Sequence, residues 1–274
     1  MNPIPEQNDS SYVLGRTNEE YERLRRQAEL WEPATKSVLH RVGLMTGMSC
    51  LDVGCGPGEV MRLMGELVGP DGRVVGLDID EVLGQQSLSF LVNRGLRQCT
   101  FIAGDVRTLD YVPGEPFDIV FTRFLLHHLD DPIAALRKMY QWLKPGGTLT
   151  VQEYYFDALN SYPPFEPVSE FKNVFFGTYG RAGKDTSVAA KLPQYFIEAG
   201  IGTPDNTDVS GHFLPMRVSA SMLSAVYRSV LPLALEFGVT TEERSAHFFE
   251  NIRETEDGTY LLWPLLFSIW KQKG

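Results

Sequence analysis

The sequence predicts an α/β fold in which helices cover both faces of a parallel sheet. From Cys50 onward, short apolar segments that end in glycine or aspartate alternate with amphipathic segments of helical length. Two parallel strands need a crossover between them, so this alternation is typical of βαβ units. No internal repeat is visible in the 274 residues, which suffice for the core of one large domain.

The N-terminal part of the chain is expected to be an arm followed by helices. Residues 1–16 read as a flexible arm, and a capping-box pattern at 17–20 predicts the start of a helix. Apolar side chains then recur every three or four positions through 21–31, as on one face of a helix. We therefore divide the chain into an N-terminal region, 1–48, and a domain, 49–274.

The repeating βα pattern lies in the first half of that domain. Its five expected strands are 49–54, 73–79, 99–105, 117–123 and 147–154. Three helices are expected between them, at 58–68, 81–94 and 132–143. The segments "VGPDGR" and "LKPGG" provide the breaks between elements.

The C-terminal part is less regular and is expected to add helices above the sheet. A proline-rich connector is expected at 161–167, followed by a helix at 188–200 and a strand at 205–213. Residues 217–238 are expected to form a helical pair, or one helix broken at Pro232. A further helix at 240–254 and a final strand at 265–273 complete the chain. We expect helical lid insertions at about 155–187 and 215–258.

Composition narrows the functional classes. A formal charge of −10 with no dense basic run disfavours nucleic acid as a partner. The longest apolar stretch, 260–270, contains Pro264 and is too short to span a bilayer. The N-terminus lacks the apolar core of a secretory signal. Three cysteines without metal-type spacing are typical of reduced thiols, so we expect a cytoplasmic protein with no metal. We expect it to be a monomer or a homodimer.

A glycine-rich segment, "LDVGCGPGE", spans the end of the first expected strand and the turn after it. Its glycines are Gly54, Gly56 and Gly58, whereas a dinucleotide fingerprint would place the third glycine at position 59. Glu59 occupies that position, and a carboxylate at a helix N-terminus competes with phosphate. The spacing thus disfavours an NAD-dependent oxidoreductase but still indicates a ligand close to the backbone.

Polar residues end the next three strands. Asp78 lies twenty residues after Gly58, where a carboxylate accepts ribose hydroxyls. Asp105 is an acceptor suited to the exocyclic amine of adenine, and Arg123 ends the fourth strand. Open α/β sheets bind ligands at this carboxyl edge. The hydrophobic residues that follow the two aspartates, Ile79 and Val106, are expected to contact an adenine ring.

The motifs "LDVGCGPGE", "VVGLDID", "AGDV", "FDIVFTRFLLHHLDDP" and "LKPGGTLTVQEY" occur in this order over residues 50–154. Together they resemble class I S-adenosylmethionine-dependent methyltransferases, most closely the branch of ubiquinone-biosynthesis-like and small-molecule enzymes. The resemblance implies a Rossmann-like, seven-stranded, mostly parallel sheet with an antiparallel last strand. It also implies S-adenosyl-L-methionine as cofactor, with S-adenosyl-L-homocysteine as its product.

The resemblance assigns cofactor roles to residues of this chain. The glycines would leave room for the methionine half of the cofactor, and Asp52 matches the acidic position near its amino group. The full set implied or expected to bind the cofactor is Tyr12, Gln27, Asp52, Gly54, Gly56, Gly58, Asp78, Ile79, Gly104, Asp105, Val106 and Arg123. Tyr12 and Gln27 belong to a segment similar to arms that close over the cofactor.

The acceptor side is less defined. His127 and His128 are tempting bases, although a structural or cofactor-side role is favoured for both. His212 is another weak candidate, although an ordinary exposed loop histidine is favoured there. Glu153 and Tyr154 end the fifth strand and are expected at the rim of the site. Nine Phe and Tyr residues lie between positions 154 and 179, which favours a small, largely apolar acceptor. A secondary metabolite is expected, with the acceptor atom open between O, N, S and C. A protein that binds the cofactor without methyl transfer, such as a pericyclase, is the alternative.

Overall fold

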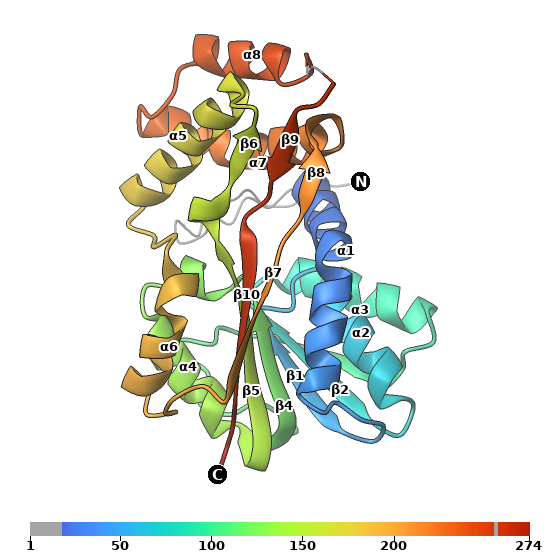
Figure 1. Cartoon of the computed structure of the whole chain (residues 1–274). Helices are drawn as coiled ribbons and strands as arrows, with labels where there is room; N and C mark the ends of the chain where they lie inside the picture. Colours follow the sequence, from blue (N-terminus) through green and yellow to red (C-terminus); the bar gives the residue numbers. More distant parts are fainter. Residues whose placement is uncertain (1–17, 255–256) are drawn as a thin grey trace.

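The computed structural model describes residues 18–254 and 257–274, with side chains from Tyr21 onward, and contains a seven-stranded sheet (Figure 1). The strand order is β3-β2-β1-β4-β5-β10-β7. These strands are β1 Ser49–Val53, β2 Arg73–Asp78, β3 Cys99–Ala103, β4 Phe117–Arg123, β5 Leu143–Tyr155, β7 Asn206–Ser210 and β10 Leu265–Gln272. Neighbouring strands from β3 to β5 pair in parallel, and β10 pairs antiparallel with β5 and β7. The expected fold class is confirmed.

Helices cover both faces of the sheet (Figure 1). They are α1 Asn18–Arg41, α2 Glu59–Val68, α3 Glu81–Asn93, α4 Pro132–Gln141 and α6 Val188–Glu198. Leu51 of β1 packs in one apolar cluster with α4 and α6, and Cys50 packs in another with α1, α2 and α3. Successive side chains of a strand point to opposite faces, so the two clusters form the two layers of the core.

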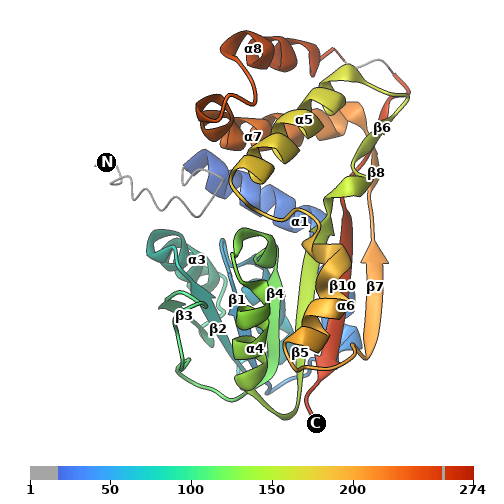
Figure 2. The ribbon, with the colours of Figure 1, turned by 90° about the vertical axis from the view of Figure 1, so that its left-hand side faces the viewer.

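A lid layer lies above the carboxyl edge of the sheet (Figure 2). It contains α5 Glu166–Arg181, α7 Met216–Glu236, α8 Glu242–Asn251 and a three-stranded sheet in the order β6-β9-β8. Those strands are β6 Asn160–Tyr162, β9 Tyr260–Leu262 and β8 Phe213–Pro215. Trp31 of α1 is fully buried in the apolar cluster of this layer, so α1 joins the lid to the sheet.

Several expected boundaries were wrong. The segment "LKPGG" is the start of β5, because its backbone bonds to the end of the chain through Gly146, Gly147 and Lys273. The segment expected as one strand at 205–213 divides between β7 and β8, which lie in different sheets. The small sheet was not foreseen, since β6 and β9 are only three residues long.

Helix α7 continues through Pro232 instead of breaking there. Tyr227, Val230 and Ala234, on both sides of the proline, are fully buried in the lid cluster. This burial offsets the lost backbone hydrogen bond. By length and composition α7 also resembles a membrane-spanning helix, although it is a third buried, and one such helix is weak evidence.

We predict that Gly58→Ala destabilises the protein by about 2–4 kcal/mol through backbone strain and overpacking. Gly58 has φ of 79°, and an added Cβ would lie 1.9 Å from the hydroxyl oxygen of Ser87 in α3. Gly95→Ala is the matched control, because its φ is 83° with no atom within 4 Å of the added Cβ. It should cost about 1–2 kcal/mol in urea unfolding. Equal losses for the two variants would contradict a packing role for Gly58.

Candidate active site

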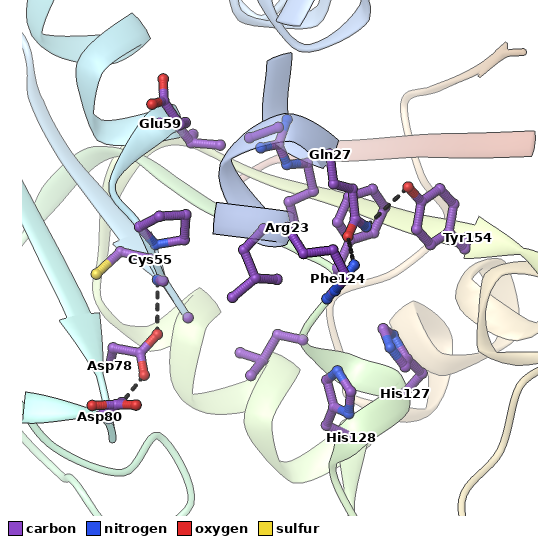
Figure 3. Close-up of a pocket in the computed structure, with 18 of the residues that line it drawn as sticks. Arg23, Gln27, Cys55, Glu59, Asp78, Asp80, Phe124, His127, His128 and Tyr154 are labelled. Carbon is purple, nitrogen blue, oxygen red and sulfur yellow. Dashed lines mark hydrogen bonds between the residues drawn. The ribbon is translucent and has the colours of Figure 1, made fainter. Parts of the chain in front are cut away.

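A cavity of about 260 Å³ lies where the carboxyl edge of the sheet meets α1 and the lid (Figure 3). Its polar half is formed by loops that follow β1, β2, β3 and β4, and its apolar half by lid residues. A cavity of this size suits a small molecule.

The glycine loop after β1 turns back against the end of β2. Gly54 and Gly56 line the cavity with φ of 72° and 47°, a backbone region that side chains rarely adopt. An added Cβ at Gly56 would meet no atom within 4 Å, so this backbone faces open space. Gly58 does not line the cavity, and its missing side chain instead allows α2 to approach α3 at Ser87.

Asp78 connects the ends of two strands. Its carboxylate accepts hydrogen bonds from the N–H of Gly56 (2.8 Å) and the N–H of Asp80 (2.9 Å) (Figure 3). Asp80 caps α3 by accepting from Leu83 N–H and also accepts from the Tyr21 hydroxyl of α1. The carboxylate of Asp78 therefore fixes the glycine loop on the cavity wall.

Apolar and charged groups follow at the ends of β2 and β3. The side chain of Ile79 is 46% exposed and lines the cavity, as do Gly104 and the buried Val106. Asp105 accepts from the backbone and guanidinium of Arg107, with Nε 2.8 Å from one carboxylate oxygen. Partial burial raises the pKa of Asp105, but hydrogen bonds and charge from Arg107 outweigh it and leave that pKa below its ordinary value.

Asp52 is a buried carboxyl group on the cavity wall. Only 1% of it is exposed, and its Oδ2 atom has no hydrogen-bond partner among the described residues. Burial raises the pKa of Asp52 to about 7, against the opposing charge of Arg123. An unpaired carboxylate oxygen in such a place fits a positively charged amino group as its partner.

Arg123 ends β4 on the same side of the cavity. Burial lowers the pKa of its guanidinium, and the charge of Asp52 opposes that shift. Its Nη1 donates to the hydroxyl of Thr35 in α1 at 2.9 Å, and that hydroxyl donates to Gln152 at 2.7 Å. Arg123 is thereby attached to both the sheet and α1.

Helix α1 covers the cavity with one of its faces (Figure 3). Gln27 lines the cavity and donates to the Tyr154 hydroxyl at 2.9 Å. Arg23 lies one turn earlier on the same face, is 3% exposed, and donates to Gln27. The sequence interpretation missed Arg23, although its i, i+4 spacing from Gln27 was a usable signal. Tyr12 lies outside the described residues.

Phe124 has a strained backbone at the centre of the cavity wall. Its φ is 59°, which is rare for a bulky residue and costs about 1–3 kcal/mol. The Phe124 ring stacks on Tyr154 with 3.9 Å between ring centroids, and its N–H donates to Gln152. Tyr154 lines the cavity, but it is buried and not at the rim where we expected it, and burial raises its pKa to about 12.

The two adjacent histidines form the 3-10 turn η1 Leu126–His128 and line the cavity (Figure 3). Glu153 does not line it. That carboxylate is fully buried and accepts from Leu126 N–H (2.6 Å), with its other oxygen 2.8 Å from His127 Nδ1. His212 also lies outside the cavity lining, and its ring packs on Trp31 at 4.6 Å between centroids.

The lid supplies an apolar half of the cavity that contains five aromatic rings, and three of them lie on α5, where each stacks on the next. Its members are Phe156, Leu159, Phe171, Phe175, Tyr179, Met222, Leu223, Val226, Trp263 and Pro264. Among the residues that the structure describes, this lid half of the lining contains no Lys or Arg; the cations that line the cavity lie on α1 and at the edge of the sheet. Within the described residues, no group of three His, Cys, Asp or Glu side chains is arranged to hold a metal ion.

Comparison with known proteins identifies relatives. A family model described as "Methyltransferase domain" matches residues 44–178. A demethylmenaquinone methyltransferase of Lactococcus lactis is 30% identical over 64% of this chain and 68% of its own length. A wheat phosphoethanolamine N-methyltransferase is 33% identical over 44% of this chain, but the match spans only 23% of that enzyme. A methyltransferase-like structure from Bacillus halodurans has a TM-score of 0.59 at 18% identity, covering 87% of this chain and 98% of its own, and shows the same fold.

We predict that Asp52→Asn stabilises the cofactor-free protein, because ionisation of this buried group opposes folding above its unfolded pKa. The folded-state pKa is raised, so the penalty grows as pH rises from about 4 to about 7 and then levels off. Urea unfolding should show a gain of about 2–4 kcal/mol at pH 8 and about 1–2 kcal/mol at pH 5. The control Asp110→Asn, whose side chain is 94% exposed, should show no such trend. A loss of stability at pH 8 would disprove the assignment.

Proposed function

We propose that this chain methylates a small, ring-containing and largely apolar acceptor. The chain belongs to the class I S-adenosylmethionine-dependent methyltransferases and uses that cofactor as methyl donor. The observation that carries the proposal is that one cavity has both a polar half on the sheet and an aromatic half under the lid. Two different molecules can meet in such a cavity, one on each wall.

The polar half suits the cofactor. S-adenosylmethionine supplies an activated methyl group on a sulfonium, and its amino group would pair with Asp52 Oδ2, the buried oxygen without a described partner. The bare backbone at Gly56 would admit its methionine half. We expect Asp78 to bind the ribose, while Asp105, Ile79 and Val106 bind the adenine. This wall positions the donor, and positioning supplies much of the acceleration of a displacement.

The lid half suits an uncharged ring. Its aromatic residues favour flat, apolar molecules, and without a cation it offers no partner for a phosphate ester. This disfavours an acceptor such as that named for the wheat enzyme. The name of the Lactococcus relative favours a quinone-type ring over the secondary metabolite that the sequence led us to expect.

We predict that Asp78→Ala weakens binding of S-adenosylhomocysteine by about 1–3 kcal/mol, the free energy of charge-assisted hydrogen bonds. Isothermal titration calorimetry measures this change. Asp110→Ala, at an exposed aspartate outside the cavity, is the control and should bind normally. Unchanged affinity of the Asp78 variant would contradict the ribose assignment.

Methyl transfer itself can be tested with a labelled methyl donor and two acceptors, 1,4-naphthohydroquinone and phosphoethanolamine. We predict label only in the ring compound. Phe175→Leu should raise KM for that compound about 3–10-fold, because ring stacking contributes ~0.5–1.5 kcal/mol. Phe176→Leu is the matched control, since Phe176 neighbours Phe175 but does not line the cavity. Tight S-adenosylhomocysteine binding without transfer to either acceptor would favour a cofactor-binding protein of another activity.

A further inference from the structure

We propose that His127 is the general base of the methyl transfer, held in the reactive tautomer by Glu153, and that the acceptor is therefore a protic group such as a phenol or quinol hydroxyl. The proposal rests on the methyltransferase function and specifies its acceptor. Neither residue belongs to the cofactor wall described above, and Glu153 is hidden from the cavity.

The carboxylate of Glu153 fixes the proton of the His127 ring. Both carboxylate oxygens accept, one from Leu126 N–H at 2.6 Å and the other from His127 Nδ1 at 2.8 Å. A carboxylate cannot donate, so Nδ1 carries the hydrogen and Nε2 of the neutral ring keeps a lone pair. Nothing in the described part of the chain forms a hydrogen bond with Nε2.

His127 lines the cavity that contains both the cofactor wall and the aromatic half. The centroid of its ring lies 5.5 Å from that of Phe156 and 6.3 Å from that of Tyr179, two rings of the aromatic half. It is only 5% exposed, so bulk water has little access to the ring. A ring acceptor stacked under the lid would place its hydroxyl beside this nitrogen.

His128 is the less suitable of the two histidines. Burial, together with the neighbouring His127 ring and the positive charges of Lys184 and Arg23, lowers the pKa of His128 well below its ordinary value. Each of these influences opposes proton uptake. His127 instead has the buried carboxylate of Glu153 at its Nδ1 atom, 2.8 Å away, which orients the ring as the carboxylate of a catalytic triad orients its histidine.

The base determines which acceptors are suitable. As the acceptor oxygen bonds to the methyl carbon, the carbon–sulfur bond breaks and its electron pair stays on sulfur. The hydroxyl proton passes to Nε2 of His127, and the positive charge lost at sulfur appears on the imidazolium beside Glu153. Total charge is unchanged, and no further reactant is needed. A tertiary amine or thioether has no proton to give and would not use this pair.

Glu153→Gln separates a chemical role of the carboxylate from a structural one. The amide keeps an oxygen that can accept from Leu126 N–H, so the turn η1 can be retained, but it removes the charge that faces His127. Glu170→Gln is the matched control, because Glu170 is another buried carboxylate. Its partner is Arg244, and it lies outside the cavity lining.

We expect long-range ¹H–¹⁵N NMR of the S-adenosylhomocysteine complex to show His127 protonated at Nδ1, with the signal assigned by its loss in His127→Asn. Glu153→Gln should shift this ring toward the Nε2-protonated tautomer. With 1,4-naphthohydroquinone as acceptor, kcat should fall about 100-fold or more, while KM and S-adenosylhomocysteine affinity stay within about twofold. Glu153→Asp should recover part of kcat, and Glu170→Gln should leave all these values unchanged.

Two results would overturn the proposal: His127 protonated at Nε2 in the unaltered protein, or an unchanged kcat in Glu153→Gln. If the unaltered protein binds S-adenosylhomocysteine but does not methylate the hydroquinone, the proposed acceptor class is wrong and the protic-acceptor inference is wrong with it. If it does not bind S-adenosylhomocysteine, the cofactor assignment itself is wrong. The two kinds of failure are therefore distinguishable.

Discussion

The parallel pairing of β1 with β2 and β4 is the constraint on which the rest of the site depends. In the register of these strands Asp52 lies opposite Gly76 on one side and Phe121 on the other, so the three strands end at the same edge. Each strand must then leave the sheet through a loop at that edge. One loop bonds to the next through the carboxylate of Asp78 and the N–H of Gly56. The cofactor wall is a direct consequence of this alignment.

Helix α1 joins this edge to the lid through buried polar contacts. Thr35 connects Arg123 to Gln152 of β5, and Gln152 in turn donates to Ser268 of β10. One turn nearer the N-terminus, Trp31 is buried in the lid cluster. Satisfied buried networks of this kind favour one arrangement, because each member left unpaired would cost free energy. The distance between the polar and aromatic halves of the cavity is therefore fixed by the packing of a single helix.

The electrostatics of the cavity reflect a conflict between stability and binding. The carboxyl group of Asp52 and the guanidinium of Arg123 are both buried, and burial moves the pKa of each toward its neutral form. A protein selected for stability alone would not retain such groups. Together with the strained Phe124 backbone, they store free energy on the wall that faces the ligand. This is the expected cost of a site preorganised for a charged partner.

The sequence by itself determined the βα order, the carboxyl edge and the cofactor class, because strand periodicity and glycine spacing are local properties of the chain. It could not place Glu153 or His212 outside the cavity lining. Glu153 faces His127, and His212 packs on Trp31, and both partners come from distant parts of the chain. It also missed the small sheet, whose three strands come from distant segments. Only the tertiary structure decided which strand ends reach the cavity, which histidine receives a carboxylate and how the lid aromatics close around it. Those contacts join residues far apart in the chain, and no local pattern encodes such a distance.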